Sequence, residues 1–155
     1  MNYVVMGVAG CGKSTVGAAF AAAIGARFID GDDLHPAANV AKMSAGVPLT
    51  DDDRWPWLDR VADVLIGNVV VGCSALKRRY RDRIRATAGP VRFLHLAGSR
   101  DVIAARMANR PGHFMPAALL DSQFAALEPP GPDEDAVTVD IDQPIAAVIA
   151  DLLAK

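Results

Sequence analysis

The sequence lacks several features that would assign it to a special class of protein. It contains only two cysteines, Cys11 and Cys73, too few for a disulfide framework and suited to a reducing compartment, so we expect a cytoplasmic protein. The formal net charge is only −2, which gives no general attraction to nucleic acid or to an anionic membrane. No apolar run approaches the ~18 residues of a membrane-spanning helix. The apolar start at 3–10 has no basic residues before it, so we expect no secretory leader.

The composition that remains is that of an ordinary globular protein. The 155 residues are 52% hydrophobic and 22% charged. This fits one domain whose hydrophobic core is large enough to be stable without disulfide bonds or a structural metal. No repeat, low-complexity tract or linker divides the chain. We therefore expect residues 1–155 to form a single domain.

Short β-branched runs alternate with helical patterns along the whole chain. Strands are predicted at 3–8, 28–29, 68–73, 91–96 and 137–141. Helices are predicted at 13–24, after Pro36, from Thr50 or Asp51 to 65, and at 76–88, 101–109, 117–127 and 145–153. This alternation predicts an α/β fold with a parallel sheet covered by helices on both faces.

A glycine-rich motif follows the first predicted strand and opens the first predicted helix. The residues Gly7-Val-Ala-Gly-Cys-Gly-Lys-Ser14 fit the pattern G-x-x-x-x-G-K-[ST], whose backbone N–H groups surround phosphate oxygens. Lys13 is predicted to reach the β- and γ-phosphates, Ser14 to bind Mg²⁺, and Thr15 to contact the α-phosphate. The nucleotide-binding residues predicted here are Gly7, Ala9, Gly10, Cys11, Gly12, Lys13, Ser14 and Thr15. We interpret Cys11 as a small loop residue rather than a nucleophile, because no base lies near it in the sequence.

A pair of carboxylates and two absences indicate the class of enzyme, and the two absences favour a small-molecule kinase over an ATPase or a GTPase. The second strand ends in Asp30-Gly-Asp-Asp33, where one carboxylate can hold Mg²⁺ through water while another orients a substrate hydroxyl and accepts its proton. The third strand ends in Gly72-Cys-Ser74 without the aspartate that holds Mg²⁺ in the ATPase and GTPase classes. A guanine-reading N-K-x-D motif is also missing.

Several longer blocks then resemble the gluconokinase family. They are Gly31–Met43 (GDDLHPAANVAKM), Pro48–Leu58 (PLTDDDRWPWL), Cys73–Asp82 (CSALKRRYRD), Gly112–Pro116 (GHFMP), Leu120–Pro129 (LDSQFAALEP) and Asp140–Pro144 (DIDQP). The resemblance implies ATP-dependent phosphorylation of D-gluconate at its 6-hydroxyl. It also implies a P-loop, nucleoside-monophosphate-kinase-like fold of three α/β/α layers with a five-stranded parallel sheet and a mobile lid, and a homodimer.

The resemblance also suggests roles for residues around the substrate. Asp32 is the candidate acceptor of the 6-hydroxyl proton, and Asp30 belongs to the outer Mg²⁺ shell. Arg54 and Lys77 are the cations expected on the substrate or the transferring phosphate. His35 and Gln123 suit the gluconate hydroxyls, because each can donate and accept hydrogen bonds. With Lys13 and Arg110, Asp32 completes the predicted catalytic set.

A lid is predicted at about 106–120. Arg106 and Arg110 are spaced to close over the phosphates before the chain breaks at Pro111-Gly112, stabilising charge and excluding water. His113 lies in the same loop and is a further candidate contact for phosphate or substrate. Gln143 and Pro144 are expected at the adenine.

The sequence is also compatible with two other functions. The chain can be a kinase for another small hydroxylated acid, such as shikimate or a different aldonate, or a nucleotide-binding regulatory protein without turnover. The basic run at 77–85 carries six cations in nine residues, and we expect a solvated helix face with one or two phosphate or substrate contacts. Trp55 and Trp57 are expected to pack between helices rather than to stack on a ligand.

Overall fold

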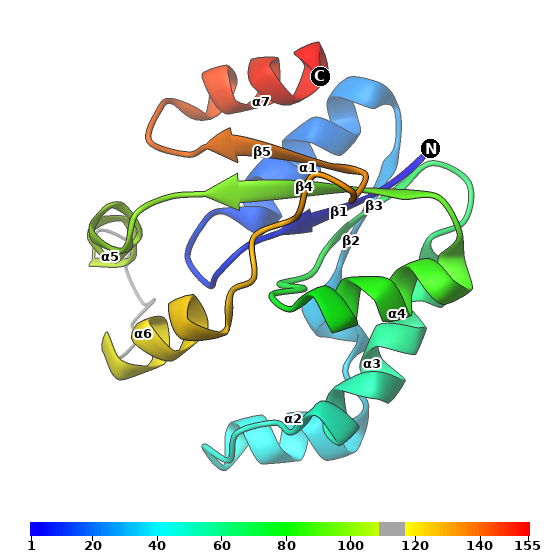
Figure 1. Ribbon diagram of the computed structural model, residues 1–155, viewed down its shortest axis with the longest axis vertical. Helices are drawn as coiled ribbons and strands as arrows, with labels where there is room; N and C mark the ends of the chain where they lie inside the picture. Colours follow the sequence, from blue (N-terminus) through cyan, green and yellow to red (C-terminus); the bar gives the residue numbers. More distant parts are fainter. Residues whose placement is uncertain (109–116) are drawn as a thin grey trace.

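A five-stranded parallel sheet forms the centre of the protein, and the computed structural model describes residues 1–108 and 117–155. The strands are β1 (Asn2–Met6), β2 (Arg27–Asp30), β3 (Val69–Gly72), β4 (Val91–Ala97) and β5 (Ala136–Asp140). Their order across the sheet is β2-β3-β1-β4-β5, and every neighbouring pair is parallel (Figure 1). The predicted α/β fold with a five-stranded parallel sheet is confirmed.

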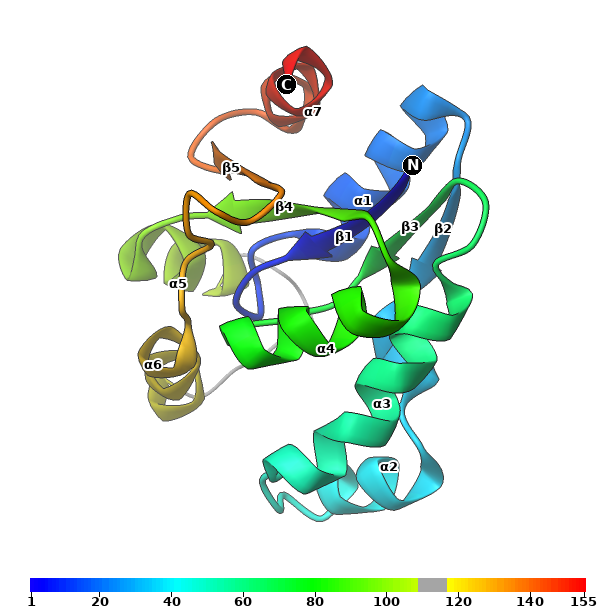
Figure 2. The same cartoon turned by 45° about the vertical axis from the view of Figure 1, so that its right-hand side comes forward.

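Helices cover both faces of this sheet. They are α1 (Lys13–Ile24), the short 3₁₀ helix η1 (Gly31–Leu34), α2 (Ala37–Ser44), α3 (Asp51–Val64), α4 (Arg78–Ala88), α5 (Arg100–Ala108), α6 (Ala117–Ala126) and α7 (Ile145–Ala154). Helices α1 and α7 pack on one face and α3 and α4 on the other, while α2 and the start of α3 project beyond the sheet (Figures 1 and 2). Within the described ranges, no helix has both the length and the apolar character needed to cross a membrane.

The central strand shows why the core has two halves. Successive side chains of a strand point to opposite faces, so Val5 joins the cluster under α1 and α7, whereas Val4 and Met6 join the cluster under α3 and α4. All three side chains are fully buried. A strand that is covered on both faces must be apolar along its whole length, which explains the unbroken hydrophobic run of β1.

The carboxyl ends of the parallel strands meet at one edge of the sheet. The glycine-rich loop follows β1, Asp30 ends β2, and Ser74 follows β3 shortly after its last residue. Strand β1 lies between β3 and β4. The connection after β1 runs toward the β3 side of the sheet, whereas the connection after β3 crosses to the β4 side. The strand order therefore reverses at β1, and a crevice opens at its carboxyl end. The fold therefore places the candidate phosphate and substrate residues around one crevice.

The start of α3 is fixed by a capping box. The Thr50 hydroxyl accepts a hydrogen bond from the Asp53 N–H at 3.2 Å, and the Asp53 carboxylate accepts one from the Thr50 N–H at 2.8 Å. These two bonds satisfy donors that would otherwise lack partners at the helix terminus. The prediction that a helix begins after Thr50 is confirmed.

Thr50→Ala should lower the free energy of unfolding by about 1 kcal/mol, because the cap loses its acceptor. Thr87→Ala is the matched control, since Thr87 is an exposed position inside α4. The control should be neutral or slightly stabilising, because alanine is the better helix former. Urea unfolding of both variants gives the comparison, and equal effects would contradict a capping role for Thr50.

Helix α4 differs from the solvated basic face expected from the sequence. The Arg81 side chain is fully buried, and its Nε and Nη2 donate to the two carboxylate oxygens of Glu134 at 2.8 and 3.1 Å. Arg81 Nη1 donates to the carbonyls of Ala75 and Leu76, and Nη2 also donates to the carbonyl of Glu128. The prediction was wrong for this residue, because its charge is neutralised inside the protein rather than by water.

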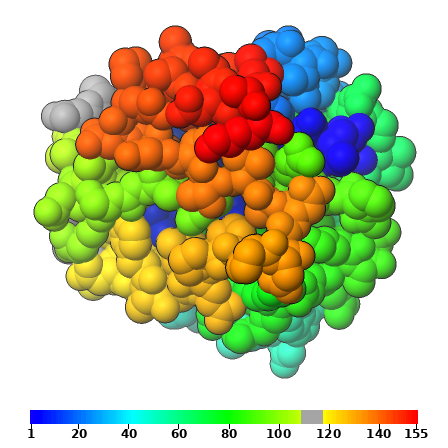
Figure 3. Space-filling view, turned by 45° about the horizontal axis from the view of Figure 1, so that its top comes forward, coloured from blue at the N-terminus to red at the C-terminus, as the bar shows by residue number. Residues whose placement is uncertain are grey.

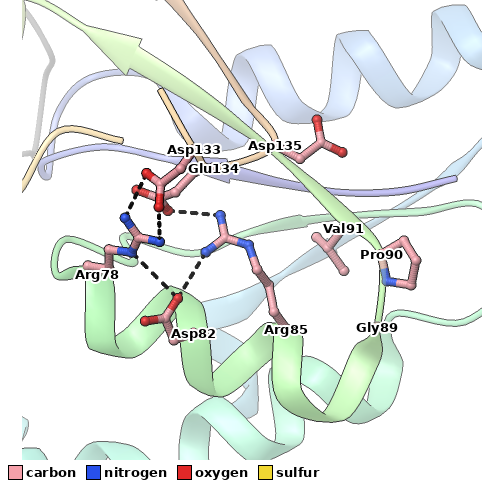
Figure 4. A pocket seen from close by; sticks show the side chains of 9 residues that line it. All are labelled: Arg78, Asp82, Arg85, Gly89, Pro90, Val91, Asp133, Glu134 and Asp135. Carbon is pink, nitrogen blue, oxygen red and sulfur yellow. Dashed lines mark hydrogen bonds and ion pairs between the residues drawn. The ribbon is translucent and has the colours of Figure 1, made fainter. Parts of the chain in front are cut away.

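The outer arginines of α4 are also engaged by carboxylates. Arg78 pairs with Asp82 and Asp133, and Arg85 pairs with Asp82 and Glu134, around a cavity of about 290 Å³ (Figure 4). In the space-filling view, the chain from α6 through the orange loop to red α7 spreads over the front face and borders green α4 (Figure 3). The pairs join α4 to this loop, so they hold the segment after β3 against the segment after α6.

Candidate active site

The glycine-rich loop between β1 and α1 adopts a conformation that requires glycine. Gly10 and Gly12 have φ values of 84° and 96°, in the left-handed region that side chains disfavour. A Cβ atom on Gly10 would also lie 2.5 Å from the sulfur of Met107, so α5 packs closely against the loop. Lys13 begins α1, and its Nζ donates to the carbonyls of Gly7 and Val8 at 3.0 and 3.1 Å. A loop that ends in a helix N-terminus beside an ammonium group suits a phosphate anion.

Ser14 and Asp30 lie together at the edge of this loop. The Ser14 hydroxyl donates to Asp30 Oδ2 at 3.5 Å, and Asp30 Oδ1 accepts a hydrogen bond from the Asp32 N–H at 3.0 Å. In the part of the chain that the structure describes, no group of three or more histidine, cysteine or acidic side chains is placed to bind a metal. One hydroxyl and one carboxylate fit Mg²⁺ rather than a fully protein-held ion, because Mg²⁺ usually keeps several waters and shares phosphate oxygens.

Asp32 lies on η1, two residues after Asp30, which ends β2. Partial burial of its carboxylate, and then the negative charge of Asp30, raise the pKa of Asp32. The residue keeps contact with solvent, which leaves room for a hydroxyl to approach. A raised pKa makes the carboxylate a better proton acceptor than an ordinary aspartate.

A cavity of about 140 Å³ opens beside the glycine-rich loop and gathers three of the predicted substrate residues. Its lining consists of Arg54, Trp57, Ser74, Leu76, Lys77, Tyr80, Gln123 and Ala126. Arg54 comes from α3, Lys77 precedes α4, and Gln123 lies on α6, so three separate segments converge here. The two cations and the amide could bind a small molecule that carries both a carboxylate and hydroxyl groups.

The Arg54 side chain is held in place by residues that the sequence reasoning did not single out. Its guanidinium lies 5.5 Å from the centre of the Tyr80 ring and 3.5 Å from Asp51 Oδ1. The Tyr80 hydroxyl donates to the same carboxylate at 2.5 Å, and this hydrogen bond is the main cause that lowers the pKa of Asp51. The only signal for Asp51 and Tyr80 in the sequence is their position inside the blocks that contain Arg54 and Lys77.

Gln123 makes a contact that was not predicted. Its Oε1 accepts a hydrogen bond from the N–H of Ala9 at 2.8 Å, so α6 is joined directly to the glycine-rich loop. The predicted role of Gln123 toward substrate hydroxyls stays a prediction, and the same side chain also lines the cavity. Gln123 therefore contacts the predicted nucleotide-binding loop and also lines the predicted substrate cavity.

The predicted lid residues fall into two groups. Arg106 lies at the end of α5, and its Nη2 donates to the backbone carbonyl of Ile141 and, at 3.4 Å, to that of Gln143. Arg106 thus contacts the turn before Pro144. Gln143 and Pro144 in this turn are the residues predicted to contact the adenine of ATP. Arg110 and His113 lie outside the described residues, as does most of the predicted lid at 106–120.

Two further predictions concern single residues near the crevice. Trp57 is buried and stacks on the ring of His35, with a centroid distance of 4.2 Å and an interplanar angle of 17°. Trp57 belongs to the core cluster under α3 and α4, as expected, and it also lines the cavity with Arg54 and Lys77, so its predicted lack of contact with a ligand stays a prediction. Cys11 is buried inside the loop and burial raises the pKa of its thiol, which agrees with a packing role.

Comparison with known proteins agrees with this arrangement. The family described as AAA domain matches residues 3–130. The chain is 50% identical to the thermosensitive gluconokinase of Escherichia coli (strain K12), covering 95% of this chain and 82% of that protein. It is 47% identical to the gluconokinase of Gluconobacter oxydans (strain 621H), covering 97% and 88%. The crystal structure of a gluconokinase from Sinorhizobium meliloti 1021 superposes with a TM-score of 0.92 at 52% identity, covering 99% and 89%. The chain therefore belongs to the gluconokinase family of P-loop kinases.

Proposed function

We propose that this protein transfers the terminal phosphoryl group of ATP to the 6-hydroxyl of D-gluconate, giving 6-phospho-D-gluconate and ADP. The observation that carries the proposal is the cavity where Arg54, Lys77 and Gln123 converge beside the glycine-rich loop. Gluconate is a polyol with one carboxylate, so it needs cations for one end and hydrogen-bonding groups along its length. Relatives that are named gluconokinases, at 47–50% identity over nearly the whole chain, support the same substrate.

The glycine-rich loop and the start of α1 would bind the phosphates of ATP. The backbone N–H groups of Lys13, Ser14 and Thr15 at the start of α1, together with the Lys13 ammonium, would bind phosphate oxygens. Ser14 and Asp30 would hold Mg²⁺, which when bound neutralises charge on the transferring phosphate. Arg106, together with Arg110 and His113, would contribute positive charge and exclude water as the proposed lid closes.

Asp32 and the cavity would bind gluconate, the acceptor of the phosphoryl group. Asp32 orients the 6-hydroxyl and accepts its proton as the oxygen attacks phosphorus. Arg54 and Lys77 bind the carboxylate of gluconate or the transferring phosphate, while His35 and Gln123 bind hydroxyls. Little covalent chemistry is required of the protein in this reaction, so positioning and charge stabilisation account for most of the rate enhancement.

A coupled assay of ADP release with Mg²⁺ and ATP tests the proposal. D-gluconate should give turnover well above a blank without acid, whereas shikimate and other aldonates should not. A preparation of Lys13→Ala is the control for contaminating kinases, since it lacks the cation expected at the phosphates. Turnover with another acid would replace the substrate, and bound ATP with no turnover on any acid would favour the regulatory alternative. Light scattering of the same sample tests the expected homodimer.

A further inference from the structure

Asn39 is a buried polar residue that no part of the proposed reaction uses. It lies on α2, is only 3% exposed, and its amide nitrogen Nδ2 has two partners. One is the backbone carbonyl oxygen of Asp53 at 2.9 Å, and the other is His35 Nδ1 at 3.2 Å. The residue therefore connects α2, α3 and His35, which follows η1.

These two contacts define the protonation of the histidine ring. A carbonyl oxygen only accepts hydrogen bonds, so the amide group that meets Asp53 must be the NH₂ group. The same NH₂ group meets His35 Nδ1, and an amide nitrogen only donates. His35 Nδ1 must then accept, which requires it to carry no proton. The ring is neutral, with its single proton on Nε2.

Other contacts keep the ring in this state. The indole of Trp57 stacks on it, and the indole N–H donates to the Gly31 carbonyl at 2.8 Å, so the plane of the stack is fixed. Burial, opposed by the charge of Asp32 and assisted by Arg54, lowers the pKa of His35 and favours the neutral ring near pH 7. Among the described residues the ring is hydrogen-bonded at Nδ1, and the side chain is only half-buried, so an Nε2–H is a donor that these contacts leave without a partner.

We propose that Asn39 is a positioning residue that holds His35 as the Nε2–H tautomer, so that His35 donates a hydrogen bond to a substrate oxygen and does not act as a second base. The substrate part of this inference rests on the proposed function, whereas the tautomer does not. With Asp32 as the base, a fixed donor at His35 restricts the orientation in which a hydroxyl can bind between them. Asn39 thus acts on the substrate only through His35.

Nitrogen NMR of the intact, ¹⁵N-labelled protein tests the tautomer without any substrate. The sequence has three histidines, and the His35→Gln variant identifies the signals that belong to His35. At pH 7.5 we expect a protonated Nε2 and an unprotonated Nδ1. An Nδ1–H ring, an imidazolium or an even mixture of tautomers in the wild type would overturn the inference, while gluconate turnover could still stand.

The variant Asn39→Asp keeps the size of the side chain and replaces the donor by an acceptor. We expect the neutral His35 ring to carry its single proton on Nδ1 instead of Nε2, so that the donor to the substrate is lost. The kcat/KM for gluconate should then fall at least tenfold, with the KM for ATP nearly unchanged. Lys42→Met is the matched control, because it breaks the other contact between α2 and α3, the Lys42–Asp53 ion pair at 2.8 Å, and leaves Asn39 in place. The control should keep the Nε2–H tautomer. An unchanged tautomer in Asn39→Asp, or a changed tautomer with unchanged kcat/KM, would contradict the proposal.

Two substitutions of His35 keep the proposal testable if Asn39→Asp does not fold. His35→Gln retains an amide donor near the position of Nε2, whereas His35→Phe retains only a ring that can stack on Trp57. We expect His35→Gln to keep at least tenfold more kcat/KM for gluconate than His35→Phe. The reverse order would mean that stacking, and not donation, is what the substrate requires.

Discussion

Asp32→Asn is expected to lower kcat for gluconate by about 10²-fold or more, because the amide cannot accept the proton of the attacking hydroxyl. The substitution keeps the size of the side chain and removes one negative charge beside Asp30. ATP binding should persist, since Lys13 and the loop N–H groups are untouched. Steady-state kinetics with gluconate, together with an ATP titration, measure the two effects separately.

Asp33→Asn provides the matched control for charge and position. Asp33 is the next residue on η1 and is also exposed to solvent, but it has no assigned role in the reaction. Its substitution should leave kcat within a few-fold of the parent. Near-normal turnover in Asp32→Asn, or equal losses in the two variants, would refute the assignment of Asp32 as the base.

Glu134→Ala is expected to lower the free energy of unfolding by roughly 3–5 kcal/mol, because it leaves the buried Arg81 guanidinium without its counter-charge. Both side chains of this ion pair are at most 1% exposed, so water cannot replace the lost carboxylate. Asp133→Ala is the control, since Asp133 pairs with Arg78 at the surface, where ion pairs contribute little. Urea unfolding at neutral pH should show a large difference between the two variants, and a similar small effect for both would contradict the role given to the buried pair.

The same ion pair should also make stability depend on pH. Burial by itself opposes ionisation of Glu134, but hydrogen bonds from Arg81, the Gly131 N–H and Arg85 outweigh it and lower the pKa of Glu134 from 4.5 to about 2. Ionised Glu134 therefore stabilises the fold above about pH 4.5, and this contribution is lost as the pH falls towards 2. Glu134→Gln should have a flatter stability profile across this window. A slope equal to that of the parent would mean that other carboxylates dominate acid unfolding.

The local signals of the sequence were sufficient for most of the fold. Helix α1 was predicted at 13–24 and observed at Lys13–Ile24, because the glycines on either side, Gly12 and Gly25, adopt the left-handed conformations that mark its ends. The positions of β1, β3 and β4 followed from short apolar runs whose residues are mostly buried on both faces of the sheet. In each case the information lay within a few residues of the element that it determines.

The features that could not be predicted depend on partners far apart in the sequence. Arg81 resembles its exposed neighbours along α4, and the counter-charge that lets it be buried comes from Glu134, 53 residues later. The contact from Gln123 to the Ala9 N–H spans 114 residues, and the amide orientation of Asn39 depends on the Asp53 carbonyl. Motif spacing and family resemblance gave the candidate residues of the site, whereas the hydrogen bonds of these side chains required the folded structure.

The two kinds of ion pair on α4 imply two responses to ionic strength. The pairs of Arg78 with Asp133 and Arg83 with Asp59 lie at the surface, where salt screens them as the Debye length shrinks from about 10 Å at 0.1 M to about 3 Å at 1 M. The pair of Arg81 with Glu134 has almost no contact with solvent ions and is screened much less. Concentrated salt should therefore loosen the outer side of this helix while its inner side stays attached to the loop behind it. Lys77, the proposed substrate cation just before α4, should then keep its place.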